Sequence, residues 1–291
     1  MAVKALVRSM RLRTLPLSLA GVVCGSLLAL PAEPSWQVRW ATLLFLYLTT
    51  VGLQILSNLS NEMGDHLSGV DGEGREGPNY SMTDGGLTVR QMWKAINAMV
   101  VVCCLSGFVM VVASFGTLLH SWQAWLVLVL GAAAIWAATH YTLGKRPYGY
   151  RGLGDLFVFI FFGLVSVLGS YYIVAHALAW DAVAPAVGCG LLSVGVLNVN
   201  NIRDMSSDEG LRKTIPLRIG QQPAKVYQTL LVAGGYLCYL FSHPHWVLAL
   251  LALPFAVHLA GVWKRQGKAL DPMLPLLVLS TFVLSLLYTL V

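Results

Sequence analysis

The chain contains 291 residues, of which 57% are hydrophobic and only 11% are charged, and its formal net charge is +6. Its mean hydropathy is +0.69. Because soluble domains are about 45–50% apolar and about 25% charged, this composition excludes an ordinary soluble protein and indicates an integral membrane protein.

Nine apolar runs have about the length that a helix needs to cross a bilayer, roughly 20 residues. Because backbone groups cannot stay unpaired in lipid, we expect helices and not isolated strands. The sequence therefore predicts an all-α membrane protein with nine transmembrane helices. The runs are 15–32, 38–58, 95–118, 122–141, 153–176, 181–200, 224–242, 246–263 and 273–291.

The basic residues predict the orientation of these runs. With a cytoplasmic N-terminus and nine crossings, all but one of the 19 Lys and Arg residues fall in cytoplasmic segments, and Arg39 is the exception. This is the bias that positive-inside topology produces, so the net charge does not indicate nucleic-acid binding. The longest loops, 64–94 and 204–223, lie on the same side and predict a cytoplasmic working face.

Smaller features have structural explanations. Lys4, Arg8 and Arg11 share a helical face near the N-terminus, which predicts either an interfacial amphipathic helix or a simple positive-inside anchor. Gly21 and Gly25 form a small-xxx-small pattern that favours close helix packing. The five cysteines lie inside apolar runs without a C-x-x-C pair, which argues against a disulfide or zinc framework.

Two polar clusters stand where an apolar run meets water, at 58–65 and 198–208, and each contains an N-[E/N]-x-x-D core. Residues at i and i+4 share a helix face, and carboxylates at a helix C-terminus favour a bound cation. Magnesium takes oxygen ligands and commonly substrate phosphates. The two clusters therefore predict one metal–diphosphate site, although ion pairs with cytoplasmic Lys and Arg residues are an alternative. The candidate metal ligands are Asn61, Glu62, Asp65, Asp71, Asn200, Asp204 and Asp208.

A diphosphate also needs cations from the protein. Tyr141 and Lys145 lie at i and i+4 where the fourth run ends, and Lys and Arg bind phosphate as a point charge and as a fork, respectively. The alternative is that these charges only set the topology. The candidate diphosphate ligands are Lys145, Arg146, Arg151, Arg203, Lys213 and Arg75, with Arg212 beside them, and the candidate catalytic residues are Asp65, Asp204, Lys145 and Tyr141.

An allylic diphosphate explains why such a site would lie in a membrane. Its ionisation gives a carbocation and pyrophosphate; a metal and lysine would stabilise the leaving group, and a membrane cavity would exclude water. Aromatic residues of the fifth run could line a groove for the isoprenoid tail or could simply pack. They are Phe157, Phe159, Phe161, Phe162, Tyr171 and Tyr172.

These motifs resemble the UbiA superfamily of intramembrane prenyltransferases. The pattern is two Asp-rich motifs after the second and sixth helices and a Tyr-x-x-x-Lys after the fourth, and the resemblance covers nearly the whole chain. Segments 54–65, 145–155 and 200–208 are most similar to the branch whose acceptor is 1,4-dihydroxy-2-naphthoate. The first motif departs from the family at Gly69, where an Asp is usual, and at Glu62, which replaces an Asp.

The resemblance implies a single domain over residues 1–291, with nine helices around a central cavity capped by loops 64–94 and 204–223. It implies that Asn61, Asp65, Asp204 and Asp208 hold Mg²⁺ and diphosphate, with Tyr141 and Lys145 nearby (all named above). The expected reaction joins polyprenyl diphosphate to the naphthoate, releases CO₂ and diphosphate, and gives demethylmenaquinol for menaquinone biosynthesis. The expected location is the bacterial cytoplasmic (inner) membrane, with the site on the cytoplasmic side and no protein partner.

Three alternatives remain open from the sequence. Another member of the superfamily could use 4-hydroxybenzoate, homogentisate or a tetrapyrrole as acceptor. A transporter of an anionic solute would explain the spans, but an anion site prefers helix N-termini and Arg over acidic helix ends. A cation channel or a structural bundle would leave the pair Tyr141 and Lys145 without a role.

Overall fold

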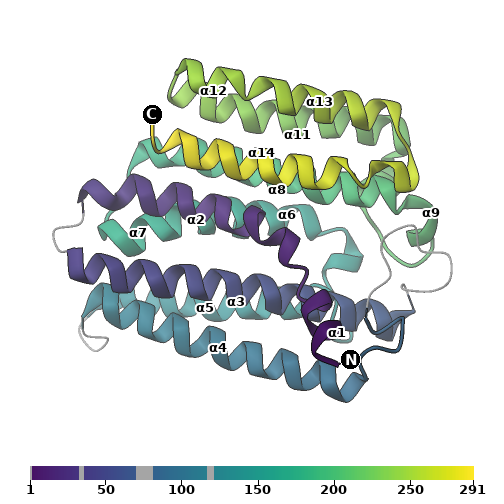
Figure 1. Ribbon diagram of the computed structural model, residues 1–291, viewed down its shortest axis with the longest axis horizontal. Coiled ribbons are helices and arrows are strands. Elements are labelled where there is room, and N and C mark those ends of the chain that lie inside the picture. Colours follow the sequence, from purple (N-terminus) through teal and green to yellow (C-terminus); the bar gives the residue numbers. More distant parts are fainter. Residues whose placement is uncertain (1, 33–35, 70–80, 117–120) are drawn as a thin grey trace.

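The computed structural model describes residues 2–32, 36–69, 81–116 and 121–291, and every regular element in these ranges is helical (Figure 1). The predicted all-α class is confirmed. The long helical segments are α2 Leu15–Ala29, α3 Trp36–Ser68, α4 Val89–Phe115, α5 Trp122–His140, α6 Gly154–Val158 with η4 Phe159–Gly169 and α7 Ser170–Ala175, α8 Val183–Arg203, α11 Gln221–Ser242, α12 Trp246–Leu250 with α13 Ala252–Lys264, and α14 Met273–Tyr288.

Each of the nine predicted apolar runs coincides with one of these segments. Within the described residues, eight helical segments are long and apolar enough to cross a membrane. The run at 224–242 is not among them, because α11 begins with the polar residues Gln221, Gln222 and Lys225 and contains Gln228. The chain is a multi-pass membrane protein. Its two termini lie at opposite ends of the bundle (Figure 1), and the ninth span stays a prediction.

The helices form layers, and the middle layer combines helices from the start, the middle and the end of the chain. Figure 1 shows α3, α4 and α5 on one side, α11, α12 and α13 on the other, and α2, α8 and α14 between them. α3 packs on α4, α8 packs on α11 and η4, and α2 contacts both α14 and η4. The middle layer therefore joins the two sides. The first polar cluster lies at the end of α3 on one side, and the second lies at the end of α8 in the middle layer.

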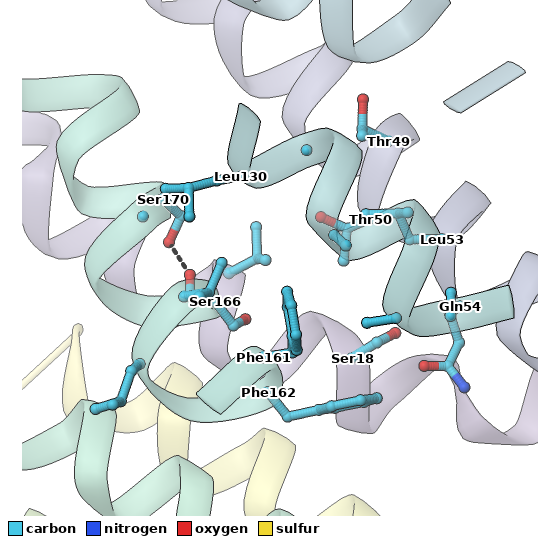
Figure 2. A pocket seen from close by; sticks show the side chains of 18 of the residues that line it. Ser18, Thr49, Thr50, Leu53, Gln54, Leu130, Phe161, Phe162, Ser166 and Ser170 are labelled. Carbon is cyan, nitrogen blue, oxygen red and sulfur yellow. Dashed lines mark hydrogen bonds between the residues drawn. The ribbon is translucent and has the colours of Figure 1, made fainter. Parts of the chain in front are cut away.

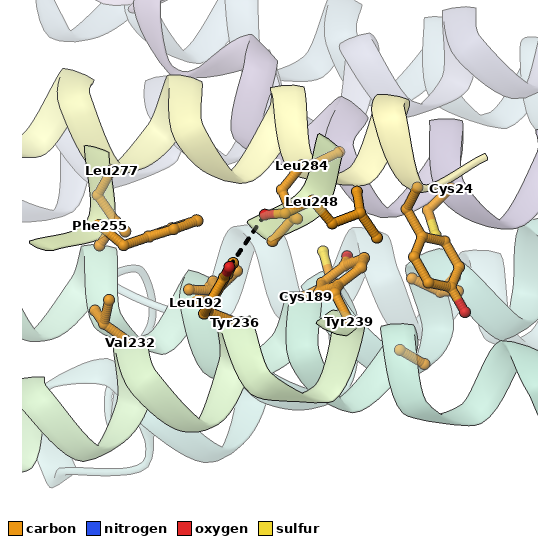
Figure 3. Packing of buried hydrophobic residues seen from close by; sticks show 14 residues of the cluster. Cys24, Cys189, Leu192, Val232, Tyr236, Tyr239, Leu248, Phe255, Leu277 and Leu284 are labelled. Atoms are coloured by element: carbon orange, nitrogen blue, oxygen red, sulfur yellow. Dashed lines mark hydrogen bonds between the residues drawn. The ribbon is translucent and has the colours of Figure 1, made fainter. Parts of the chain in front are cut away.

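Close approach in the middle layer depends on glycine. A Cβ on Gly21 would lie 2.4 Å from Oγ of Ser166, and one on Gly25 would lie 2.0 Å from the carbonyl oxygen of Val167. The packing role predicted for these two glycines is confirmed. A buried cluster fills the neighbouring space between α8, α11 and α14 (Figure 3), where the Tyr236 hydroxyl donates to the Leu248 carbonyl at 3.0 Å.

The length of α3 explains where the first polar cluster lies. Its 33 residues span about 50 Å at about 1.5 Å per residue, whereas the hydrocarbon core of a bilayer is about 30 Å thick. The last turns of α3, which carry Asn61, Glu62 and Asp65, therefore extend beyond the hydrocarbon. The shorter elements gather at this same end: α1 Ala2–Ser9, η1 Leu12–Thr14, η3 Gly149–Arg151, α9 Met205–Asp208, α10 Ile215–Ile219 and η6 Gly267–Leu270.

The N-terminal helix α1 packs against the first long loop. Its Arg8 pairs with Asp84 at 2.7 Å, and the hydroxyl of Ser81 donates to the carbonyl of Ala5 at 2.7 Å. The opposite face of α1 leaves Val3 77% exposed. α1 therefore packs one face on the first long loop and leaves the other exposed.

Candidate active site

A long apolar cavity of about 670 Å³ runs between α2, α3, α5 and the η4–α7 segment. Most of its lining is apolar, and Figure 2 shows Phe161 and Phe162 beside Ser18 and Gln54 within it. Towards the end of α3 the lining becomes polar, with Asn58 and Asn61 of α3 and the Tyr141 ring after α5. The cavity therefore connects an apolar interior with the first polar cluster.

Aromatic side chains form one wall of this cavity. Tyr148 and Phe157 stack with ring centroids 4.0 Å apart, and Phe161 continues the row at 6.2 Å from Phe157. Four of the six aromatic residues predicted to line a groove do so: Phe157, Phe161, Phe162 and Tyr172. Aromatic faces attract cations, so this wall suits a substrate that develops positive charge.

The other two aromatic residues follow the alternative that was left open and pack against neighbouring helices. The ring of Phe159 faces α8, where a Cβ on Gly190 would lie 2.7 Å from it, and Tyr171 packs into the cluster around α4 and α7. Residues 159–169 form a π-helix, and Tyr171 lies in the α-helix that follows it.

Asn61 is held at the polar end of the cavity by the chain that follows α5. The hydroxyl of Thr142 donates to the Ser60 carbonyl at 2.9 Å and lies 3.3 Å from the amide oxygen of Asn61. The two segments touch closely because Gly64 has no side chain, since a Cβ there would lie 2.5 Å from the Cβ of Thr142. The neighbours Tyr141 and Asp65 are thereby kept close together.

Asp65 is buried and has two partners. The hydroxyl of Tyr150 donates to its Oδ1 at 2.7 Å, and Arg212 forms an ion pair with the same oxygen. The Tyr150 ring lies under the Arg212 guanidinium, 4.9 Å from the ring centroid. Burial and the Asp65 carboxylate raise the pKa of Tyr150, which keeps this phenol protonated as a donor.

Glu62 faces a different neighbour. It is fully buried, and its Oε1 accepts from the backbone N–H of Met82 at 2.9 Å. Its Oε2 has no hydrogen-bond partner in the described part of the chain. The structure thus places Glu62 against the first long loop, and the predicted ligands Asp71 and Arg75 lie outside the described residues.

Asp204 belongs to a second network at the end of α8. Both of its carboxylate oxygens accept from Arg203, at 2.8 and 2.7 Å, and Arg203 also donates to Asn200 and Asp271 at 2.8 and 2.9 Å. Arg203, predicted as a diphosphate ligand, is only 3% exposed. α8 ends at Arg203, so Asp204 lies at the joint between α8 and α9, and the backbone N–H of Asp208 donates to its carbonyl at 2.9 Å.

Arg212 joins the two polar clusters. It pairs with Asp65 from α3, and its Nε lies 3.7 Å from a carboxylate oxygen of Asp208 at the end of α9. The two acidic helix ends, far apart in sequence, are therefore neighbours in space. Burial lowers the pKa of Arg212, but the two carboxylates outweigh this and raise it above its ordinary value.

The Tyr141 phenol lies in the same electrostatic environment. Burial raises its pKa to about 12, with Arg212 lowering it and the nearby carboxylates, including Asp65 and Asp208, raising it. The neutral phenol is therefore the form present at physiological pH, and it can donate a hydrogen bond into the cavity.

The segment after α5 docks on the segment after α9. The N–H of Lys213 donates to the Tyr150 carbonyl at 3.0 Å, and Arg218 donates to the Arg151 carbonyl at 3.2 Å. The intervening Gly152 has φ +81, and a Cβ there would lie 2.9 Å from the Lys213 carbonyl. Exposed basic side chains surround this junction, and they are Lys145, Arg146, Arg151 and Lys213.

The oxygen donors at this junction fit a magnesium ion. Asp65 and Asp208 offer carboxylates, Asn61 offers an amide oxygen, and Arg212 shows that a positive charge is accommodated between the two acids. Among the described residues no group of three His, Cys, Asp or Glu side chains could hold a metal ion. Mg²⁺ commonly takes one or two carboxylates and completes its shell with substrate phosphates and water, so two carboxylates are sufficient.

Some residues of this arrangement could not be found from the sequence. Tyr150 lies inside the predicted basic segment, and its aromatic and basic neighbours were a usable signal. Thr142 follows Tyr141 but carries no charge, and Asp271 lies far from either motif, so neither has a sequence signal. Their importance follows only from contacts with Asn61 and Arg203.

Comparisons with known proteins agree with this architecture. Residues 18–274 match the UbiA prenyltransferase family. The chain is 41% identical to the 1,4-dihydroxy-2-naphthoate octaprenyltransferase of Escherichia coli (strain K12), covering 99% of this chain and 94% of that protein. It is 36% identical to the protein of the same name from Haemophilus influenzae, covering 96% and 92%.

A solved structure shares the fold. A UbiA homolog from Archaeoglobus fulgidus bound to GPP and Mg²⁺ superposes with a TM-score of 0.64 at 14% identity, covering 99% of this chain and 100% of that one. The resemblance drawn from the sequence motifs is thus confirmed over most of the chain: this multi-pass membrane protein is a prenyltransferase that belongs to the UbiA family.

Proposed function

We propose that this prenyltransferase moves a polyprenyl group from polyprenyl diphosphate to 1,4-dihydroxy-2-naphthoate, as one step of menaquinone biosynthesis. The C–O bond of the allylic diphosphate breaks, and diphosphate leaves with the electron pair. The naphthoate ring carbon bonds to the prenyl carbon, and its carboxylate leaves as CO₂, so no further reactant is needed. The product is demethylmenaquinol. The names and high coverage of the bacterial relatives support this choice of acceptor.

The observation that carries the proposal is the meeting of Asp65 and Asp208 at Arg212, beside the polar end of an apolar cavity. Asn61, Asp65 and Asp208 would hold magnesium here, with Asp204 next to them at the end of α8. The bound metal would neutralise the diphosphate charge as the C–O bond breaks. The prenyl tail would lie along the aromatic wall of the cavity.

The protein's own side chains would act on charge and water. The exposed Lys145, Arg146 and Arg151 beside the junction would attract and orient the diphosphate. The neutral Tyr141 phenol would donate a hydrogen bond to a leaving oxygen. The apolar lining would keep water from the carbocation. Loops 64–94 and 204–223 would close over this end as a cap on a single domain.

The same proposal includes an orientation. The end of the bundle with α1, α9 and α10 carries nearly all basic residues of the chain, which favours the cytoplasmic side of a bacterial cytoplasmic membrane. Anionic substrates would then approach from the cytoplasm towards a basic face.

The test is a turnover assay on the purified protein with radiolabelled carboxylate. The expected result is magnesium-dependent release of CO₂ with 1,4-dihydroxy-2-naphthoate and little product with 4-hydroxybenzoate. Prenylation of 4-hydroxybenzoate without CO₂ release would instead assign another acceptor of the family. Transport of label into vesicles without use of prenyl diphosphate would overturn the assignment of a catalytic site to these residues.

A further inference from the structure

Two arginines neutralise the carboxylates proposed to hold magnesium. Arg203 forms an ion pair with Asp204, and Arg212 lies between Asp65 and Asp208. All three acids are at most 5% exposed. Buried carboxylates without a partner are costly, so each arginine stabilises the site in the form that the structure describes.

The two arginines differ in how they are anchored. Arg203 donates to Asn200 and Asp271 as well as to Asp204, so most of its contacts hold it in place whether or not a metal is bound. It belongs to α8 and is almost fully buried.

Arg212 has no such anchor among the described residues. It follows α9 in an irregular segment, and its side chain contacts Asp65, Asp208 and the Tyr150 ring. Its Nε is buried without a hydrogen-bond partner in the described part of the chain. Every polar contact of its guanidinium is therefore with the carboxylates that a metal would need.

We infer that Arg212 is a place-holding cation. It pairs with the Asp65 and Asp208 carboxylates when no metal is bound, and it pairs with the diphosphate instead when a metal–diphosphate complex binds. The inference depends on the proposed diphosphate site. A guanidinium fork fits phosphate oxygens as well as it fits carboxylates, so Arg212 exchanges one anionic partner for another. The metal takes the carboxylate oxygens that Arg212 leaves.

This exchange has a consequence for the order of binding. A divalent cation alone must displace Arg212 and leave a buried guanidinium beside a like charge, so metal binds weakly by itself. Diphosphate offers Arg212 a new partner, so metal and diphosphate strengthen each other's binding. Such coupling is reciprocal, because each ligand changes the affinity of the other by the same factor.

The experiment measures Mn²⁺ binding to the purified full chain by electron paramagnetic resonance, with and without inorganic pyrophosphate. In the wild type, pyrophosphate should raise the affinity of the protein for Mn²⁺ about tenfold or more, after correction for the Mn²⁺–pyrophosphate complex that forms in solution. A factor of about ten is the smallest that a displaced ion pair would produce. An equal affinity of the wild-type protein for Mn²⁺ with and without bound pyrophosphate would overturn the inference, and this comparison does not depend on any variant.

Arg212→Gln removes the charge and keeps a polar side chain. It should bind Mn²⁺ alone about tenfold more tightly than the wild type and lose most of the pyrophosphate coupling. Arg212→Lys keeps the charge and should leave Mn²⁺ binding weak. Arg218→Gln is the matched control, since it makes the same substitution at a nearby exposed arginine whose side chain donates to the Arg151 carbonyl, and it should not raise the affinity for Mn²⁺ alone.

The outcomes separate this inference from the proposed function. If Mn²⁺ and pyrophosphate bind the wild type but Arg212→Gln and Arg218→Gln change the affinity for Mn²⁺ alone equally, only the place-holding role is overturned. If the wild type binds no Mn²⁺ even with pyrophosphate, the metal–diphosphate site fails and the place-holding role fails with it. A lower unfolding temperature of metal-free Arg212→Gln, restored by Mn²⁺, would support the exchange independently.

Discussion

Gly64 lies where the two catalytic segments touch, and Gly64→Ala is a direct test of how closely they must pack. A Cβ at this position would lie 2.5 Å from both the Cβ and the Oγ1 of Thr142 and 2.6 Å from its carbonyl oxygen. The carbonyl belongs to the backbone and cannot rotate away. To restore ordinary contact, α3 and the segment after α5 must separate by nearly 1 Å, because interiors are closely packed.

The magnitude follows from two opposing effects. Overpacking of this kind costs about 1–3 kcal/mol, whereas replacing a mid-helix glycine with alanine returns about 0.5–1 kcal/mol. The net loss of unfolding free energy should therefore be at most about 2.5 kcal/mol, which leaves the bundle folded. The separation falls between Asp65 and Tyr141, the chain neighbours of Gly64 and Thr142. A displacement of about 1 Å can cost about 100-fold in rate.

The assay compares prenyl transfer with thermal unfolding for Gly64→Ala and Gly107→Ala. A Cβ on Gly107 of α4 would meet only Thr49 Cγ2 at 3.7 Å, an ordinary contact, so this control should keep its activity and unfold at the same or a higher temperature. We expect Gly64→Ala to lose about 100-fold in turnover while remaining folded. Full activity with unchanged stability would refute the close contact between the two segments.

Two further predictions concern the segment after α5. Lys145→Ala should weaken the binding of prenyl diphosphate more than that of the aromatic acceptor, because an exposed ammonium close in sequence to Tyr141 would attract phosphate. KM values for the two substrates measure this, and equal increases would argue against a phosphate role. Burial raises the pKa of Tyr141 to about 12, so its contribution to stability is complete below about pH 10, the ordinary value, and is lost as the pH rises through 12. Unfolding temperatures of wild type and Tyr141→Phe should therefore keep a constant difference up to about pH 10 and converge above it, whereas a difference that changes between pH 6 and 9 would contradict the buried neutral phenol.

The positions of the helices could be predicted because the bilayer imposes a length on every apolar run. The runs at 38–58 and 181–200 lie in α3 and α8, and the polar residues that end them lie at one end of the bundle. The topology also predicted that the two polar clusters belong to one site, because helix ends on the same side of a membrane are confined to a thin layer. The contact of Arg212 with Asp65 and Asp208 agrees with this argument.

The direction in which side chains point could not be predicted in the same way. Glu62 precedes Asp65 by less than one turn, yet it faces the backbone of Met82. The second motif was expected to lie on one helix, but α8 ends at Arg203 and α9 begins at Met205, so Asp204 lies at the joint between them. Spacing arguments assume a continuous α-helix, and they lose force where a helix ends, as α8 does at Arg203.

The roles of the charged loop residues could not be predicted from their position in the sequence either. Arg203 and Lys213 both follow the second motif, but the first is buried in an ion-pair network and the second is exposed. The difference depends on Asp271, which comes from the last part of the chain and carries no motif. Long-range partners of this kind decide whether an arginine is structural or available to a substrate.

The metal–diphosphate site requires that Asp65 of α3 and Asp208 of α9 bind the same complex. The most direct measurement is a double-mutant cycle with Asp65→Asn and Asp208→Asn, scored as Mn²⁺ binding in the presence of pyrophosphate. Each single change should lower the affinity by about tenfold or more, and the double change should cost much less than the product of the two, because residues of one site are coupled. Independent, multiplicative losses, or wild-type affinity in either single variant, would contradict a shared site.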